Sequence, residues 1–190
     1  MKLAVLGSTN GTDLDAVVAA IRGGVLDASI EVVISNNVDS GILAKAEMHS
    51  IDRFYVSHKN KKRDVFDLEM SQILEDREID LILLVGFMRI LSSSFVDRWA
   101  GKIINVHPSL LPKHAGGMND SVHESVLLSG DRETGCTIHL VTKEVDSGPI
   151  LLQLSCPVDV GDSIEDLKNK VQKLEGQAFV KVIKNWRNNE

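Results

Sequence analysis

Apolar residues along this chain occur in two alternating kinds of segment, short continuous runs and longer stretches with helical spacing. The short runs, rich in Val, Ile and Leu, predict strands at Lys2–Leu6, Ile30–Ile34, Phe54–Val56, Ile79–Val85, Lys102–His107, Thr134–Thr142 and Pro149–Pro157. Stretches in which apolar residues recur every three or four positions predict helices at Asp13–Ile21, Ile42–Met48, Asp64–Glu78, Asn119–Ser129 and Ser163–Trp186. The run Ile79–Val85 is almost entirely apolar, which is typical of a central parallel strand covered on both faces.

The regular alternation of strands and helices predicts the fold class. It indicates an α/β domain of Rossmann-like type, with a mostly parallel twisted sheet, right-handed connections and helices on both faces. Only a turn around residues 143–148 separates the last two predicted strands, so we expect an antiparallel hairpin at the C-terminal edge of the sheet. The chain has no repeat or linker, and residues 1–190 are predicted to form a single domain.

Composition and charge exclude several classes of function. The chain is 43% hydrophobic and 25% charged, as is usual for a soluble globular protein, and its net charge of −6 argues against electrostatic binding to nucleic acid or to an anionic membrane. The apolar run Leu3–Leu6 is too short for a signal peptide, and no stretch approaches membrane-spanning length, so we expect a cytoplasmic protein. Cys136 and Cys156 are too few for a disulfide scaffold or a metal site; we expect reduced thiols, near each other across the hairpin, and no bound metal.

Polar residues at the end of one predicted strand mark a candidate active site. Asn105 and His107 are two positions apart, so their side chains project from the same face, and Pro108 ends the strand. The carboxyl ends of strands are where ligands usually bind in α/β proteins. With Asp146 from the later turn, an Asn, a His and an Asp could run acyl transfer with neither a metal nor a covalent nucleophile. Taken singly, however, His107 is more often structural, and Asp146 more often belongs to a plain turn.

Several segments resemble a known family. They are Asn10-Gly11-Thr12-Asp13-Leu14, Gly86-Phe87-Met88-Arg89-Ile90-Leu91, Asn105–Pro112, Asp146–Ile150 and Val171–Glu175. On these motifs the whole chain resembles the phosphoribosylglycinamide formyltransferases, the folate-dependent transformylases of purine biosynthesis. The resemblance implies transfer of the formyl group of 10-formyltetrahydrofolate to the primary amine of glycinamide ribonucleotide, with small molecules as the partners and a monomer or homodimer as the assembly.

The resemblance also implies roles for single residues. Asn105 and a protonated His107 would stabilise the tetrahedral intermediate, and Asp146 would hold the imidazole and assist proton transfer. The expected folate-binding residues are Arg63, Met88, Arg89, Ile90, Leu91, Lys143, Glu144 and Val145. The expected substrate-binding residues are Asn10, Gly11, Thr12, Asp13, Gln172 and Glu175. On this basis the N-terminal half forms the phosphate side of the site, and the C-terminal half holds the folate side and the catalytic residues.

Two segments depart from the family pattern. The family usually has Ser-Asn where this chain has Thr12-Asp13, and a carboxylate facing a phosphate dianion would repel it. Asp13 therefore either turns outward as a helix cap, or the anionic end of the substrate differs. Residues 113–120 form a longer and more glycine-rich loop than the commonest family form, and we expect it to be mobile over the substrate.

Simpler interpretations and other functions stay open. Asn10–Asp13 also fits a helix-capping turn with Thr12 or Asp13 as the cap, Gln172 and Glu175 fit a solvated helix edge, and Arg63 fits a basic surface run. Of the other histidines, His114, His123 and His139 are weaker site candidates, with His123 expected in a helix near the site and His139 able to face the pocket, whereas His49 and His58 are expected at the surface. The alternative enzymes are a sugar-nucleotide N-formyltransferase, a formyltetrahydrofolate hydrolase and a tRNA formyltransferase, which usually carry additional length or domains. A non-catalytic folate-binding protein would keep the pocket without needing all three polar residues.

Overall fold

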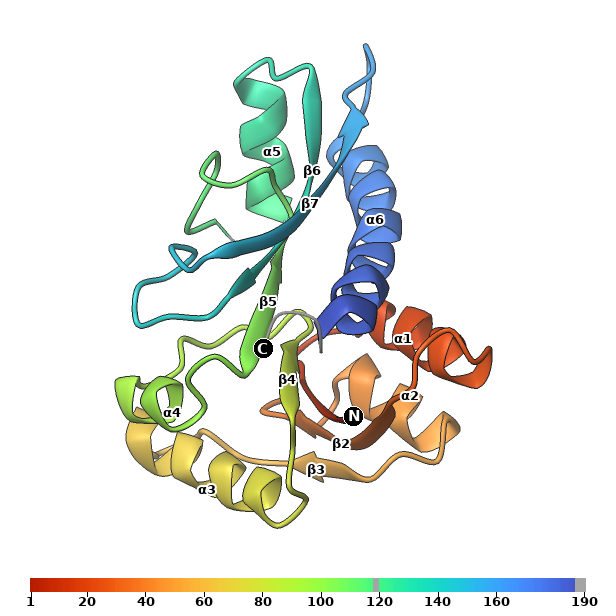
Figure 1. Ribbon diagram of the computed structural model, residues 1–190. Coiled ribbons are helices and arrows are strands. Elements are labelled where there is room, and N and C mark those ends of the chain that lie inside the picture. The colour runs from red at the N-terminus through yellow and green to blue at the C-terminus, as the bar shows by residue number, and fades with distance from the viewer. Residues whose placement is uncertain (118–119, 187–190) are drawn as a thin grey trace.

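Seven strands form a single sheet in the computed structural model, which describes residues 1–117 and 120–186 (Figure 1). The strands are β1 (Lys2–Leu6), β2 (Ser29–Ser35), β3 (Arg53–Tyr55), β4 (Leu81–Leu84), β5 (Ile103–His107), β6 (Glu133–Leu140) and β7 (Ile150–Pro157). Their order across the sheet is β3-β2-β1-β4-β5-β6-β7. The first five pair in parallel, and β6 and β7 add antiparallel pairs at one edge. The predicted fold class, a mostly parallel α/β sheet with an antiparallel C-terminal edge, is confirmed.

Helices cover both faces of the sheet. They are α1 (Thr12–Arg22), α2 (Gly41–Met48), α3 (Arg63–Glu75), α4 (Ser93–Arg98), α5 (Asp120–Leu128) and α6 (Ile164–Asn185). Alternate residues of β1 serve the two faces: Leu3 and Val5 pack with α1, α2 and α6, while Ala4 and Leu6 pack with α3 and α4. All four of these side chains are fully buried, because the central strands have a helical layer on each side.

Several predicted boundaries were wrong by a few residues. The helix expected over Asp64–Glu78 ends at Glu75, and the chain then turns through Glu78 in a left-handed conformation with φ 54°. Helix α4 was not predicted, because six residues are too few to show a helical period; it begins where the Ser92 hydroxyl accepts a hydrogen bond from the Phe95 N–H. None of the helices in residues 1–117 and 120–186 is long and apolar enough to cross a membrane.

The long C-terminal helix α6 has a well-defined start. The Ser163 hydroxyl accepts a hydrogen bond from the Asp166 N–H, and the Asp166 carboxylate accepts one from the Ser163 N–H at 3.0 Å. The helix then buries an apolar stripe that includes Leu167, Val171 and Ala178. This arrangement holds α6 against α1 and β6, close to the carboxyl ends of the parallel strands.

The loops that follow β1 and β4 pack directly against each other. Gly86 has φ 58°, and a Cβ atom there would lie 2.4 Å from Thr9 Oγ1, so the position requires glycine both for its backbone conformation and for space. The Met88 N–H donates a hydrogen bond of 2.8 Å to Ser8 Oγ. These contacts fix the segment Gly86–Leu91 at the edge of the sheet where the predicted site residues lie.

The two cysteines lie on the antiparallel hairpin as expected. Cys136 is opposite Leu154, and Cys156 is opposite Thr134, so the two thiols are diagonal neighbours on adjacent strands. Both are free thiols. Burial raises the pKa of Cys136 to about 12, so this thiol is inert and packs as a small apolar group.

Candidate active site

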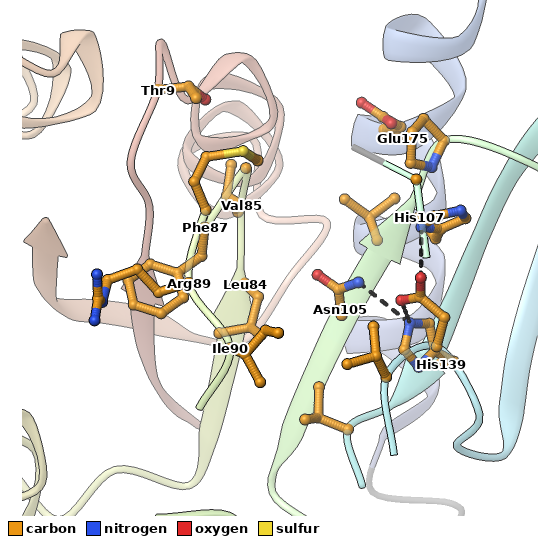
Figure 2. A pocket seen from close by; sticks show the side chains of 18 of the residues that line it. Thr9, Leu84, Val85, Phe87, Arg89, Ile90, Asn105, His107, His139 and Glu175 are labelled. Carbon is orange, nitrogen blue, oxygen red and sulfur yellow. Dashed lines mark hydrogen bonds and ion pairs between the residues drawn. The ribbon is translucent and has the colours of Figure 1, made fainter. Parts of the chain in front are cut away.

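A cavity of about 440 Å³ opens at the carboxyl ends of β1, β4 and β5. Figure 2 shows its two walls, with Leu84, Phe87, Arg89 and Ile90 on one side and Asn105, His107, His139 and Glu175 on the other. The first wall is mostly apolar and comes from the β4–α4 segment. The second is polar and comes from β5, β6 and α6.

The three predicted catalytic residues meet on the polar wall. Asn105 and His107 project from β5 into the cavity, and the turn before β7 brings Asp146 to them. Asp146 Oδ2 lies 3.3 Å from His107 Nδ1, and it also accepts the Gly116 N–H at 2.8 Å. Asp146 has φ 53°, a left-handed backbone conformation that directs its carboxylate back toward β5. The structure therefore brings together three residues that are up to 41 positions apart in the sequence, the interval from 105 to 146.

His139 is a fourth polar residue of this wall. It lies opposite Asn105 in the β5–β6 pair, and the two side chains are joined by a 3.2 Å hydrogen bond (Figure 2). Its Nδ1 donates to the Leu140 carbonyl at 2.9 Å, and its Nε2 lies beside Asn105 Nδ2. This fixes the orientation of the Asn105 amide and leaves its second N–H for a ligand. His139 Nε2 is also 3.6 Å from Asp146 Oδ1.

The charge states on this wall follow from burial and from neighbouring groups. Burial lowers the pKa of His107 below its ordinary value, and the opposing effects of Asp146 and the His114 carbonyl do not overcome it. His107 is only 3% exposed, which favours the neutral ring in the ligand-free protein; its protonation during the reaction stays a prediction. Burial alone would raise the pKa of Asp146, but contacts with His139, the Gly116 N–H and His107 bring it below the ordinary value. The site at rest thus holds a carboxylate beside a neutral imidazole.

Hydrogen bonds of His114 hold the loop after β5 in place. The backbone carbonyl of this residue accepts a hydrogen bond of 3.0 Å from His107 Nε2. Its ring contacts Ser125 Oγ at 2.8 Å and Asp131 Oδ2 at 2.9 Å. His114 therefore positions the loop and is not itself in the cavity wall. Part of the predicted mobile segment and the predicted helix start, Met118 and Asn119, lies outside the described residues.

Most of the expected folate-binding residues line the cavity. Met88, Arg89, Ile90 and Leu91 belong to the apolar wall, and Lys143, Glu144 and Val145 come from the segment between β6 and β7. Arg89 packs over the Phe66 ring at 5.0 Å, and its buried Nε has no hydrogen-bond partner among the described residues. Arg63 does not belong to this wall: it is the first residue of α3, exposed and outside the cavity.

At the other end of the cavity, α1 and α6 supply the expected substrate-binding residues. The cavity lining includes Gly11, Thr12, Asp13, Gln172 and Glu175, whereas Asn10 is exposed and lies outside it. The N-cap of α1 is Gly11, so neither Thr12 nor Asp13 caps the helix. Asp13 also does not turn outward: only 4% of it is exposed.

Two further cavity residues were missed or given little weight from the sequence. Lys168 lines the cavity with Gln172 and Glu175, at a spacing of i, i+4 and i+7 that places all three on one face of α6. His123, on α5, is 3% exposed, and its Nδ1 has no hydrogen-bond partner within residues 1–117 and 120–186. Burial lowers its pKa. The helical spacing was the available signal for Lys168. Among the described residues, no group of three or more His, Cys, Asp or Glu is placed to hold a metal ion.

Comparison with known proteins gives consistent results. The sequence profile of the family described as formyl transferase matches residues 1–183. Phosphoribosylglycinamide formyltransferase from Haemophilus influenzae is 40% identical over 184 residues, which is 96% of this chain and 85% of that protein. Trifunctional purine biosynthetic protein adenosine-3 from Gallus gallus is 43% identical over 180 residues, 94% of this chain but only 18% of that protein. The chain thus spans less than a fifth of this trifunctional relative.

The structural comparison gives the same result. Glycinamide ribonucleotide transformylase 1 from Symbiobacterium toebii superposes with a TM-score of 0.95 at 32% identity, and the match covers 100% of this chain and 88% of that one.

Proposed function

Because this chain belongs to the formyl transferase family, we propose that it transfers the formyl group of 10-formyltetrahydrofolate to the primary amine of glycinamide ribonucleotide. The observation that carries the proposal is the convergence of Asn105, His107 and Asp146 on one wall of the cavity, facing an apolar wall. The polar wall suits reaction at a carbonyl carbon, and the apolar wall suits a flat heterocycle. The amine of the acceptor approaches from the end of the cavity that is lined by α1 and α6.

The apolar wall fits the folate donor. Ile90 is 52% exposed within the cavity lining, which leaves apolar surface for a pterin ring to cover. Residues Lys143–Val145 close the cavity from the opposite side. The donor supplies an activated formyl carbon, and the residues on the polar wall act on it.

The α1–α6 end fits the phosphorylated acceptor. The first turn of α1 presents backbone N–H groups and the positive end of its helix dipole, which favour an anion. Lys168 and Gln172 on α6 add a cation and an amide at the same end. Each side of the cavity uses residues from both halves of the chain. Helix α6, from the C-terminal half, helps to form the acceptor side, and Met88–Leu91, from the N-terminal half, helps to form the folate side.

Asn105 and His107 would perform the chemistry through a hydrogen bond and a proton transfer. As the amine nitrogen bonds to the formyl carbon, the carbonyl electrons move to oxygen, and the second N–H of Asn105 Nδ2 donates to that oxygen. One such donor is typically worth about 3–4 kcal/mol of barrier. His107 Nδ1 accepts the amine proton, and Asp146 stabilises the resulting imidazolium at 3.3 Å. His107 then returns the proton to N10 as the bond from N10 to the formyl carbon breaks, which leaves tetrahydrofolate and the formylated amine.

A direct assay tests this function. The enzyme is mixed with 10-formyltetrahydrofolate and glycinamide ribonucleotide, and loss of the formyl group is followed by absorbance. We expect turnover that depends on the ribonucleotide. Parallel reactions with water alone and with an amino-sugar nucleotide test the two competing enzyme classes. Turnover in either of these, with none on glycinamide ribonucleotide, would overturn the proposal, and folate binding without any turnover would leave a binding protein.

A further inference from the structure

Two buried carboxyl groups face the acceptor end of the cavity. Asp13, in the first turn of α1, is 4% exposed, and Glu175 on α6 is 9% exposed. Both line the cavity. Asp13 Oδ1 has no hydrogen-bond partner among the described residues. An ionised carboxylate without a partner is costly to bury, so this oxygen needs either a proton or a ligand.

The groups around Asp13 do little to neutralise its charge. From α6, Asp13 Oδ1 lies 3.9 Å from the position that a Cβ on Gly176 would occupy, which places it beside the residue that follows Glu175. From β6 it faces the neutral thiol of Cys136. From α2 the nearest cation is Lys45, which is already paired with Asp15 on the outer side of α1. Glu175, the residue before Gly176, is a second buried carboxyl group and interacts electrostatically with Asp13.

We propose that Asp13 is a specificity-determining residue that binds the acceptor phosphate as a neutral carboxyl group, donating its O–H to a phosphate oxygen. This inference rests on the proposed function, since glycinamide ribonucleotide is the phosphorylated acceptor. A neutral carboxyl group offers one O–H donor, where a side-chain amide would offer N–H donors. It thereby removes the repulsion that an aspartate would exert on a dianion at the end of α1.

The electrostatics of the pair support a bound proton near neutral pH. Burial raises the pKa of Asp13 to about 7, although the charge of Lys45 acts in the opposite direction. Burial, and then the neighbouring Asp13, raise the pKa of Glu175 to about 8. Two buried carboxyl groups so placed do not both ionise, so the pair keeps at least one proton at neutral pH.

The consequence is a pH-dependent affinity for the acceptor. A phosphate dianion bound against Asp13 raises the pKa of Asp13 further, so binding takes up a proton. The affinity for the acceptor is then highest below the pKa of Asp13 in the free enzyme, and it falls by up to about tenfold per pH unit above that pKa. The phosphate loses its own second proton near pH 6. Changes in acceptor affinity above pH 7 therefore come from the protein or from the substrate amine.

The test compares wild type with D13N from pH 6.5 to 9. Asparagine keeps the size and a donor but cannot ionise, and the substrate amine titrates alike in both proteins. We expect the KM for glycinamide ribonucleotide to rise at least tenfold more in wild type than in D13N between pH 7 and 9, with kcat alike. The exposed control D39N, outside the cavity, should follow wild type. Equal pH dependence of KM in wild type and D13N would overturn the proposal.

Two further measurements make the outcome independent of the stability of D13N. Calorimetric titration of wild type with glycinamide ribonucleotide, in buffers of different ionisation enthalpy, should show net proton uptake at pH 8; no uptake would contradict the proposal. E175Q should keep the pH dependence, because burial and Lys45 are what shift the pKa of Asp13. If E175Q abolishes the dependence and D13N keeps it, the titrating group is Glu175 and the proposal is wrong. Absence of any transfer to glycinamide ribonucleotide by wild type would instead refute the proposed function.

Discussion

Replacing Asp146 by asparagine should slow formyl transfer severely and leave folate binding nearly unchanged. Asp146 Oδ2 is 3.3 Å from His107 Nδ1 and accepts the Gly116 N–H at 2.8 Å. The amide of D146N keeps an oxygen for Gly116, so the turn and the donor cavity stay intact. What the variant lacks is the negative charge beside His107 when the ring takes up the amine proton.

The size of the effect follows from that separation. Two unit charges 3.3 Å apart attract by about 5 kcal/mol at an effective dielectric constant of about 20. The side chains of His107 and Asp146 are only 4% and 8% exposed, so water screens little of this attraction. Allowing for some rearrangement, a loss of about 3–5 kcal/mol corresponds to a kcat lower by about 10²- to 10⁴-fold.

The measurement is kcat with both substrates saturating, together with the Kd of tetrahydrofolate by calorimetry. The matched control is D97N. It removes a carboxylate that pairs with Lys143 at 2.7 Å on the exposed rim, where such a pair is worth at most about 1 kcal/mol. A D146N enzyme with kcat within a few-fold of D97N would refute the role of Asp146 in the chemistry. An equal loss of folate affinity would show that Asp146 acts by shaping the cavity.

Three other outcomes are expected. N105A should lower kcat by about 10²- to 10³-fold with KM little changed, because the lost N–H acts on charge that develops during the reaction; a change confined to KM would contradict this. G86A should lower the free energy of unfolding in urea by about 2 kcal/mol, compared with about 1 kcal/mol for G101A. Both positions have positive φ, but only at Gly86 does an added Cβ meet an atom, Thr9 Oγ1 at 2.4 Å, so equal losses would refute the close-contact argument. The His107 ring followed by NMR in the free enzyme should titrate with a pKa below 6.5, and lower still in D146N, because burial lowers it and Asp146 partly offsets the effect; a midpoint above 6.5 in wild type would contradict this.

The fold could be predicted from the sequence because its signals are local and strong. The apolar run around β4 and the alternation of strands with helices sufficed for the parallel sheet and its antiparallel edge. Helix α4 escaped prediction, since its six residues begin with a single hydrogen bond from Phe95 to Ser92 and show no period.

Site residues could be predicted where the period of a strand determines the direction in which their side chains project. Asn105 and His107 face the cavity because they are two residues apart on one strand. The orientation of Asp13 was not predictable, because it depends on how closely α6 approaches α1, a contact between distant segments. The same holds for the charge of His107, which is determined by burial that no local pattern reveals. Arg63 was chosen by resemblance alone, and at the start of α3 it lies outside the cavity lining.

The hydrogen bond from Gly116 to Asp146 joins two loops that lie 30 residues apart, and neither loop belongs to the sheet. Connecting segments of this kind open locally at a lower free energy than the core strands beneath them. When this contact opens, the carboxylate leaves His107 while β1, β4 and their helical layers stay folded. We therefore expect heat or mild denaturant to break the contact between the loops, and to reduce activity reversibly, before the core unfolds.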